Sequence, residues 1–324
     1  MKEPDVSFLP IIDLSATRTG DVDATAAAAR AIDAVCRQHG FFYVTGHGIS
    51  PDLRAQVFAA SRSFFAQPED VKQRAHIRHS AYRRGYEALG HQSLDPGKPS
   101  DLLEAFNIGL DFDLSLPAGA TAPRRGPNQW PEGPLGATLQ DAAVPYMAEL
   151  ESLSRHLMRL LAIGLELKPD HFEPFMTSPV PTLRLLHYPP QPAVSEPDQI
   201  GCGAHTDWGA LTLLAQDMSG GLQVQDASGE WHEVPPIEDS FIVNLGDLMA
   251  RWTNDAYRST VHRVINRVSG RDRYSLPYFF DIDYYSVVSA LPGCHDDANP
   301  ARYPPVTAGE HHQEKLRQAR GGYG

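Results

Sequence analysis

The spacing of apolar residues changes at Pro169, and this change limits the folds open to the 324-residue chain. Before Pro169, apolar residues recur at helical spacing over residues 22–39 and 136–167. After it, short β-branched and aromatic runs are separated by turn signals such as the Ser-Gly-Gly at 219–221. These runs cover residues 182–188, 211–216, 222–225, 231–234, 241–245, 260–266 and 273–281. Many short strands at such spacing predict a β-sandwich or barrel that follows a helical region.

The N-terminal part is predicted to mix helices with short strands. Residues 8–14 and 40–49 have the apolar, β-branched composition of strands. Ser50 and Pro51 are a favourable N-cap and first helical residue, so a second helix is expected to begin there. Residues 76–133 are expected to be irregular.

The composition is that of a soluble globular protein. Hydrophobic residues make up 42% of the sequence, and no stretch approaches the roughly 18–20 consecutive apolar residues of a transmembrane helix. The 28 basic and 40 acidic side chains give a net charge of −12, which disfavours nucleic-acid binding because phosphate contacts need a basic surface. We therefore expect no nucleic-acid or membrane partner, and nothing indicates an obligate protein partner.

The cysteines and the N-terminus predict a cytoplasmic location. Cys36, Cys202 and Cys294 are widely spaced and form no CxxC motif, so neither a disulfide framework nor a cysteine-based zinc site is expected. This usage fits a reducing compartment. The N-terminus has acids and a proline where a signal peptide needs a basic start and an apolar core.

A histidine two residues before an acid is a weak metal-site pattern, and it occurs four times in this chain. The pairs are His171/Glu173, His205/Asp207, His295/Asp297 and His312/Glu314. Only His205 and Asp207 lie directly before a convincing buried strand, GALTLLAQ. Residues two apart on a strand project to the same face, so these two side chains can reach one ion.

His262 is the best candidate for a third ligand, because it lies in a β-branched run that antiparallel strands could return to His205. Two histidines and one carboxylate on one face would leave open positions on the ion, as in non-haem Fe(II) oxygenases. A zinc hydrolase that uses the same three residues is an alternative. Taken alone, His262 is more commonly an ordinary core or surface histidine.

Arg273 and Ser275 form a candidate carboxylate site at the start of the predicted strand RYSLPYFF. Their side chains share one face of the strand, and Arg binds carboxylates in a planar, bidentate manner. Tyr188 could add a phenol donor from a neighbouring strand. The alternative is that Arg273 forms a surface ion pair and Tyr188 only ends a strand.

These residues, in this order, resemble the Fe(II)/2-oxoglutarate-dependent dioxygenases of the isopenicillin N synthase-like family. The resemblance runs from about residue 9 to about residue 310 and includes LPIIDLS (9–15), GFFYVTGHGI (40–49) and NLGDLMARWTNDAYRSTVHRV (244–264). Many plant members carry Asn where this chain has Leu186.

The resemblance implies a fold and a set of roles. The fold is mainly β with helices (α+β): a double-stranded β-helix, or jelly roll, with an N-terminal helical region. A mixed α/β region over 1–170 would pack on a catalytic core over 171–310, followed by a C-terminal tail over 311–324. The polar sequence EHHQEKLRQAR at 310–320 by itself predicts a solvated helix. His205, Asp207 and His262 match the iron ligands, and Arg273, Ser275 and Tyr188 match the residues that contact 2-oxoglutarate.

The implied reaction couples oxidative decarboxylation of 2-oxoglutarate by O₂ to hydroxylation or another C–H oxidation of a small organic molecule. Three alternatives remain open on the sequence: an oxidase of this fold that uses O₂ without 2-oxoglutarate, the zinc hydrolase, and a binding protein without activity. The expected walls of the substrate pocket are Trp208, Phe279, Phe280, Arg84 and Tyr86. Residues 76–112 and the tail near residues 303–320 are expected to border this pocket.

Overall fold

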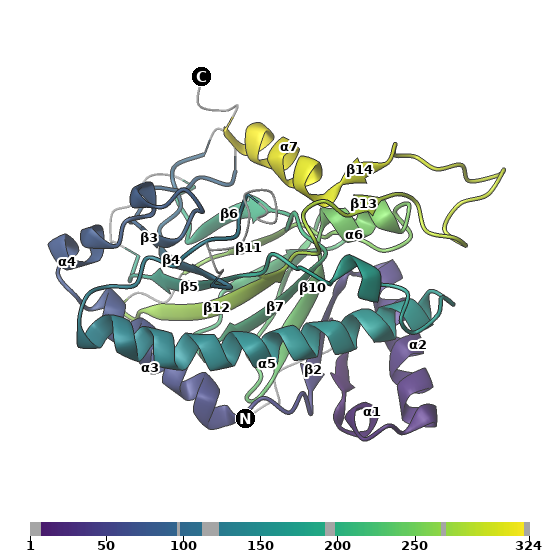
Figure 1. The fold of residues 1–324 in the computed structure, drawn as a ribbon, viewed down its shortest axis with the longest axis horizontal. Coiled ribbons are helices and arrows are strands. Elements are labelled where there is room, and N and C mark those ends of the chain that lie inside the picture. The colour runs from purple at the N-terminus through teal and green to yellow at the C-terminus, as the bar shows by residue number, and fades with distance from the viewer. Residues whose placement is uncertain (1–7, 96–97, 112–122, 192–197, 267–269, 321–324) are drawn as a thin grey trace.

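The computed structural model describes residues 8–95, 98–111, 123–191, 198–266 and 270–320. Its largest element is an eight-stranded sheet (Figure 1). In spatial order this sheet contains β1 (Ile11–Asp13), β2 (Phe41–Thr45), β10 (Phe241–Leu245), β7 (Leu211–Gln216), β12 (Arg273–Phe280), β5 (Thr182–Tyr188), β4 (Glu104–Gly109) and β3 (Gly85–Glu87). Its ladders are antiparallel except for β1 with β2.

A second sheet of four strands faces the large one. It contains β6 (Cys202–His205), β11 (His262–Val264), β8 (Leu222–Gln225) and β9 (Trp231–Glu233) in that order, and β13 (Val287–Val288) pairs separately with β14 (Val306–Thr307). Two facing antiparallel sheets with helices on one outer face are the jelly-roll arrangement that the sequence predicted.

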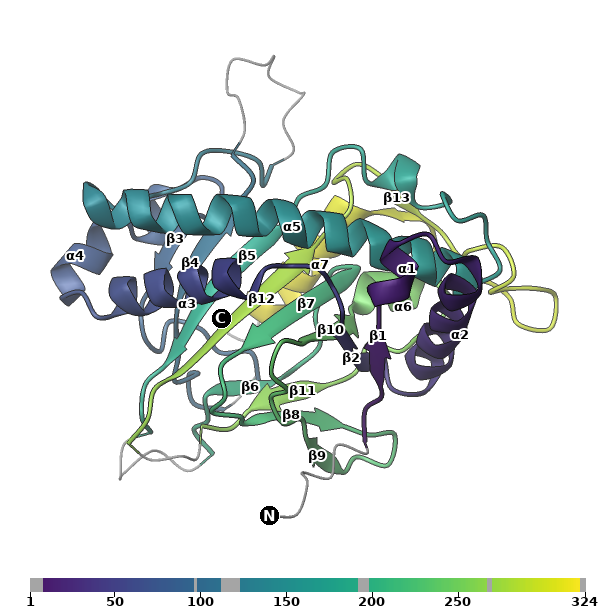
Figure 2. The ribbon, with the colours of Figure 1, turned by 90° about the horizontal axis from the view of Figure 1, so that it is seen from below.

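The helices flank this β core. They are α1 (Ser15–Arg18), α2 (Val22–Gln38), α3 (Pro51–Phe65), α4 (Glu69–Arg74), α5 (Pro134–Gly164), α6 (Asp247–Trp252) and α7 (Ala308–Arg320), with 3₁₀ turns at Ile77–His79 and Glu173–Phe175. Figure 2 shows α3 and α5 side by side across the outer face of the large sheet. In Figure 1, α7 lies on the opposite side of that sheet.

Local sequence explains where the N-terminal helices begin and end. Asp21 caps α2 by accepting a hydrogen bond from the backbone N–H of Ala24, and Ser50 caps α3 through Leu53 N–H. Gly40 follows α2 with a φ of +66°, and a Cβ there would lie 2.1 Å from the carbonyl oxygen of Arg258. Only glycine fits at this turn into β2.

Strand β12 divides the apolar interior into two parts because its side chains alternate between its faces. Leu276, Tyr278 and Phe280 join the core under the helices. Arg273, Ser275, Pro277 and Phe279 instead line a cavity on the face toward the small sheet. The polar residues of β12 therefore lie between the two sheets.

The seven strands predicted after Pro169 are all present, and the helices at 22–39 and 136–167 appear as α2 and α5. The expectation that residues 76–133 are irregular is wrong for β3 and β4, and β6 was not predicted. All of β4 is buried, but Glu104 and Asn107 interrupt its apolar pattern.

Strands from residues 1–170 and from 171–310 share the large sheet, and the division of the chain at 170 remains a prediction. Within the described residues, no helix combines the length and apolar character needed to cross a bilayer.

Candidate metal centre and carboxylate pocket

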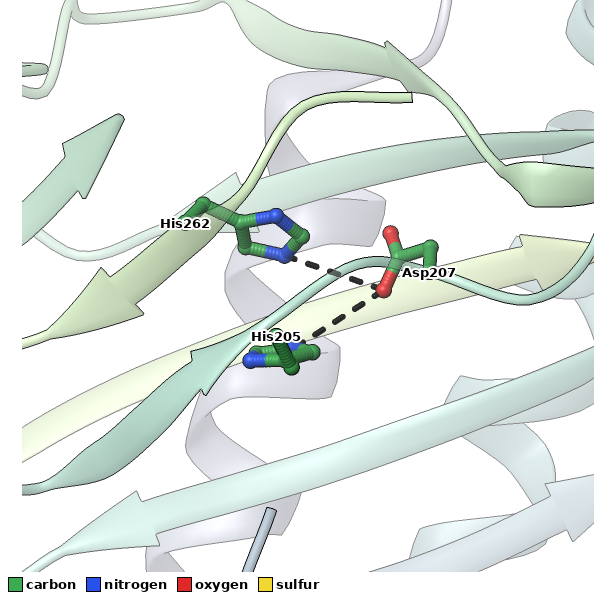
Figure 3. A group of neighbouring side chains, drawn as sticks. All are labelled: His205, Asp207 and His262. Atoms are coloured by element: carbon green, nitrogen blue, oxygen red, sulfur yellow. Dashed lines mark ion pairs between the residues drawn. The ribbon is translucent and has the colours of Figure 1, made fainter. Parts of the chain in front are cut away.

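His205, Asp207 and His262 converge at one point between the two sheets (Figure 3). His205 ends β6 and His262 begins β11, and the two residues are directly paired across these strands. Asp207 follows β6, and its Oδ1 lies 3.9 Å from His205 Nε2 and 3.7 Å from His262 Nε2. The three candidate ligand atoms all lie within 4.8 Å of one another, so a single ion can contact all of them.

Backbone carbonyls orient both imidazole rings. His205 Nδ1 lies 2.8 Å from Gly203 O, and His262 Nδ1 lies 3.1 Å from Thr260 O. A carbonyl oxygen can only accept, so each neutral ring carries its proton on Nδ1 and leaves the Nε2 lone pair free. This is the way in which histidine ligands are usually held for a metal ion.

Asp207 is held in a similar way. Thr212 Oγ1 and Asn244 Nδ2 donate to its Oδ2 at 2.6 and 2.7 Å, which leaves Oδ1 facing the histidines. Burial opposes ionisation of Asp207, but the two histidines and these hydrogen bonds lower its pKa below the usual value. Burial and the nearby His262 also lower the pKa of His205. Two neutral nitrogens and one anionic oxygen on one face suit Fe(II) with open coordination positions.

Arg273 is a buried cation in the same cavity. The residue is 1% exposed, and its guanidinium donates to Gly220 O at 2.7 Å, Gln216 Oε1 at 3.0 Å and Ser275 Oγ at 3.2 Å. The ring of Tyr188 packs against it, 4.7 Å from the guanidinium carbon. No carboxylate among the described residues forms an ion pair with Arg273.

This arrangement fits a carboxylate ligand. An unpaired buried charge is costly, and a bound anion would offset that cost through charge-assisted hydrogen bonds. One cavity is lined by the three candidate metal ligands together with Arg273 and Ser275, so a short dicarboxylate can contact the ion and the guanidinium together. Leu186 also lines this cavity and offers no hydrogen bond.

An outer cavity adjoins the metal ligands and contains some of the predicted walls. Trp208 and Phe279 line it. The predictions for Phe280, Arg84 and Tyr86 are wrong. Phe280 points into the core under the helices because it is one residue away from Phe279 on β12.

Arg84 and Tyr86 are buried with partners of their own. Arg84 donates to Arg124 O at 2.7 Å, and Tyr86 OH donates to Glu104 Oε2 at 2.6 Å. Arg83, the neighbour of Arg84, lines the outer cavity instead.

Sequence reasoning missed several residues of the outer cavity. Asn107 on β4, Arg184 on β5 and His312 on α7 all line it. Asn107 and His312 lie in the two segments, 76–112 and 303–320, that were expected to border the pocket, but neither residue was singled out as a wall. His312 had been noticed only in a histidine-x-acid pair, and it forms no metal-ligand cluster among the described residues.

A second group that could hold a metal ion was also missed. Asp226, Glu230 and His232 meet at the turn between β8 and β9. Asp226 already accepts hydrogen bonds from Ser228 and from Glu230 N–H, and its Oδ2 lies 2.8 Å from His232 Nε2. These hydrogen bonds explain why the three side chains meet at this turn, and no metal ion is needed to hold them together.

Comparison with known proteins identifies the family. Residues 9–133 match the model of the non-haem dioxygenase N-terminal region named for morphine synthesis, and residues 179–282 match the 2OG-Fe(II) oxygenase superfamily. The 2-oxoglutarate-Fe(II) type oxidoreductase hxnY of Emericella nidulans is 39% identical over 303 residues, which cover 92% of this chain and 86% of the relative. The chain belongs to the 2-oxoglutarate- and Fe(II)-dependent oxygenases.

Other members of this oxygenase family agree in sequence and in structure. The 2-oxoglutarate-dependent dioxygenase citB of Monascus ruber is 42% identical over 287 residues, covering 86% of each chain. A full-length Neurospora crassa protein solved in complex with alpha-KG (2-oxoglutarate) superposes with a TM-score of 0.84 at 31% identity, covering 97% of this chain and 98% of the other. JOX2 in complex with 2OG, Fe and JA superposes with a TM-score of 0.77 at 30% identity, covering 95% and 84%.

As an Fe(II)/2-oxoglutarate-dependent dioxygenase, the protein couples oxidative decarboxylation of 2-oxoglutarate to oxidation of a small molecule. The predicted fold, enzyme class and cofactors are thereby confirmed. Relatives named for 2-oxoglutarate favour this reading over a direct oxidase, a zinc hydrolase or an inactive binding protein.

Proposed function

We propose that His205, Asp207 and His262 hold Fe(II), and that Arg273 and Ser275 bind the far carboxylate of 2-oxoglutarate. The observation that carries this proposal is the buried guanidinium of Arg273, which has no carboxylate partner among the described residues and shares a cavity with the three ligands. Tyr188 packs against that guanidinium and limits its orientation.

Each residue has a separate task in this scheme. When bound, iron and 2-oxoglutarate supply the O₂-dependent oxidation of a C–H bond. His205 and His262 present Nε2 because their Nδ1 protons are held by backbone carbonyls. Asn244 and Thr212 fix Asp207 so that only Oδ1 faces the ion. The cavity that Arg273 shares with the three candidate metal ligands has apolar walls that exclude water, which include Leu186, Leu222 and Val264.

The outer cavity is the proposed substrate site, because it shares His205 and Asp207 with the metal centre. The substrate is a small organic molecule, in keeping with the thymine bound in a structure of the Neurospora crassa protein, which is 29% identical to this chain. The net charge of −12 supports a function without a nucleic-acid partner. We retain the expectation of no membrane partner and no obligate protein partner.

The remaining sequence predictions belong to the same proposal. The three cysteines are all free and buried, which supports a reducing, cytoplasmic environment. We retain the division into a region over 1–170, a catalytic core over 171–310 and a tail over 311–324.

The decisive experiment is anaerobic addition of Fe(II) and then 2-oxoglutarate to the purified protein. Chelation of iron by the keto acid produces a visible charge-transfer band, which we expect for the wild type and for His295→Ala, a change in an exposed loop. His262→Ala should abolish the band. A wild-type protein without the band, or a His262→Ala variant that keeps it at the wild-type iron concentration, would refute the assignment.

A further inference from the structure

Helix α7 is anchored beside the metal centre at several points. The backbone N–H of Gly309 donates to Tyr284 O at 2.8 Å, and His311 Nε2 lies 3.0 Å from Trp208 O. Lys315 Nζ lies 2.6 Å from Asp247 Oδ2, which also accepts a hydrogen bond from Thr206 Oγ1 at 3.1 Å. The helix is therefore tied to the segment that carries Asp207, and its inward side chains have a fixed place.

His312 is the polar side chain that α7 contributes to the outer cavity. Its ring lies edge-on to Trp208, with ring centroids 5.3 Å apart, and its Nδ1 lies 3.4 Å from Arg124 Nη1. A guanidinium can only donate, so Nδ1 accepts and the proton of the neutral ring is on Nε2. Burial, with Arg124 and Arg83 nearby, lowers the pKa of His312 to about 2, so the ring stays neutral.

The Nε2–H of His312 is available to donate a hydrogen bond to a ligand. Among the described residues, no hydrogen bond to Nε2 is present, and the contact with Arg124 uses the other nitrogen. A neutral imidazole of this tautomer can offer one donor and no charge.

Asn107 provides the complementary group. Asn107 is 5% exposed as a residue, and it lines the same cavity. Its Nδ2 donates to Gly85 O at 3.3 Å, while its Oδ1 accepts no hydrogen bond from the described residues. The cavity wall therefore has an unused acceptor as well as an unused donor.

Two of the arginines in the outer cavity are already neutralised. Arg124 pairs with Asp281 at 2.9 Å, and Arg184 pairs with Glu87 at 2.8 Å. These pairs contrast with Arg273, which lacks a carboxylate partner among the residues described here. An anionic substrate would lose its hydration without gaining a new ion pair from Arg124 or Arg184, and a cation would find Asp281 and Glu87 already paired with these arginines, so a charge of either sign is penalised.

We propose that His312 is a specificity-determining residue that donates its Nε2–H to the carbonyl oxygen of an uncharged, amide-type substrate, while Asn107 Oδ1 accepts the N–H of that group. The substrate class is then a small molecule with adjacent carbonyl and N–H groups, stacked between aromatic walls that include Trp208 and Phe279. This inference rests on the proposed function, because it takes the outer cavity to be the substrate site.

The test compares three planar probes of one size: benzamide, benzoate and benzamidine. Binding to the anaerobic complex of protein, Fe(II) and 2-oxoglutarate is measured by titration calorimetry. We expect benzamide to bind more tightly than the anion and the cation. His312→Phe should weaken benzamide binding roughly threefold to tenfold, as expected for one lost hydrogen bond, and His312→Gln should retain most of it because the amide still donates.

His295→Phe is the matched control, because His295 lies in an exposed loop, and it should leave the affinity for benzamide unchanged. Tighter binding of benzoate or benzamidine, no binding of benzamide, or an unchanged affinity in His312→Phe would overturn the inference. The ranking of the three probes by the wild type tests it even if a variant fails to fold. A missing charge-transfer band would instead refute the proposed function.

Discussion

His262 lies directly opposite His205 across the β6–β11 pair, and their ring centroids are 4.3 Å apart. The ladder is irregular immediately beyond this pair, between His262 and Val264. Pairing of two short strands therefore sets the distance between the two histidines. Asp207 is placed separately, by Thr212 and Asn244, after β6 has ended.

Replacing Asn244 with Leu should weaken the hold on the Asp207 carboxylate and so lower the affinity for Fe(II). The buried Oδ2 would lose one of its two donors, and the carboxylate could rotate Oδ1 away from the histidines. Loss of such supporting contacts typically weakens metal affinity by roughly 10- to 100-fold. Anaerobic titration with Fe(II), followed by the charge-transfer band at saturating 2-oxoglutarate, measures this affinity. An unchanged iron affinity would show that Thr212 alone positions the carboxylate.

Replacing Arg273 with Ala should raise the 2-oxoglutarate requirement far more than the iron requirement. Truncating one partner of a buried charged pair costs at least about 2 kcal/mol, so the apparent Kd for 2-oxoglutarate should rise about 30-fold or more. Separate titrations of 2-oxoglutarate and Fe(II) distinguish the two effects. Arg302→Ala is the control, because Arg302 forms an exposed ion pair with Asp255. A 2-oxoglutarate requirement like that of the wild type would remove Arg273 from the site.

Replacing Glu104 with Gln should destabilise the protein by about 3 kcal/mol, because the buried ammonium of Lys72 would lose its buried carboxylate partner and keep only the exposed Glu69 at 3.2 Å. Glu104 is 5% exposed, and it bonds Lys72 and Tyr86 at 2.6 Å and His187 at 2.7 Å. Burial opposes its ionisation, but these hydrogen bonds lower its pKa below the usual value. Urea unfolding measures the loss, and Glu173→Gln in an exposed pair is the control. Equal stability of the two variants would contradict the prediction.

The buried neutral ring of His312 should make the metal-free protein less stable in mild acid. Below the ordinary histidine pKa of 6.5, the unfolded chain binds a proton that the folded chain does not bind, so stability falls as the pH falls. Between pH 7.5 and 5.5 this one group should cost about 1.4 kcal/mol. His312→Gln lacks that cost, so urea unfolding at both pH values should show a smaller loss for the variant. Parallel losses would mean that His312 is protonated in the folded protein.

The strands after Pro169 were predictable because each has a clear β pattern of its own. His205 and Asp207 could be singled out as candidate ligands because they are two residues apart and directly precede such a strand. Strand β4 was missed because the buried Glu104 is polar, and only its contacts with Lys72, Tyr86 and His187 explain its place. The role of His312 depends on the packing of α7 against Trp208, which no local spacing reveals.

Neither part of the chain completes the large sheet without the other. Strand β2 pairs with β10, and β4 pairs with β5 over six residue pairs. A fragment that starts at residue 171 would leave the hydrogen-bonding groups of both β10 and β5 unpaired along their outer edges. Such bare edges invite other chains to add to them. Residues 1–170 thus cover strand edges through which residues 171–310 could otherwise associate with other chains.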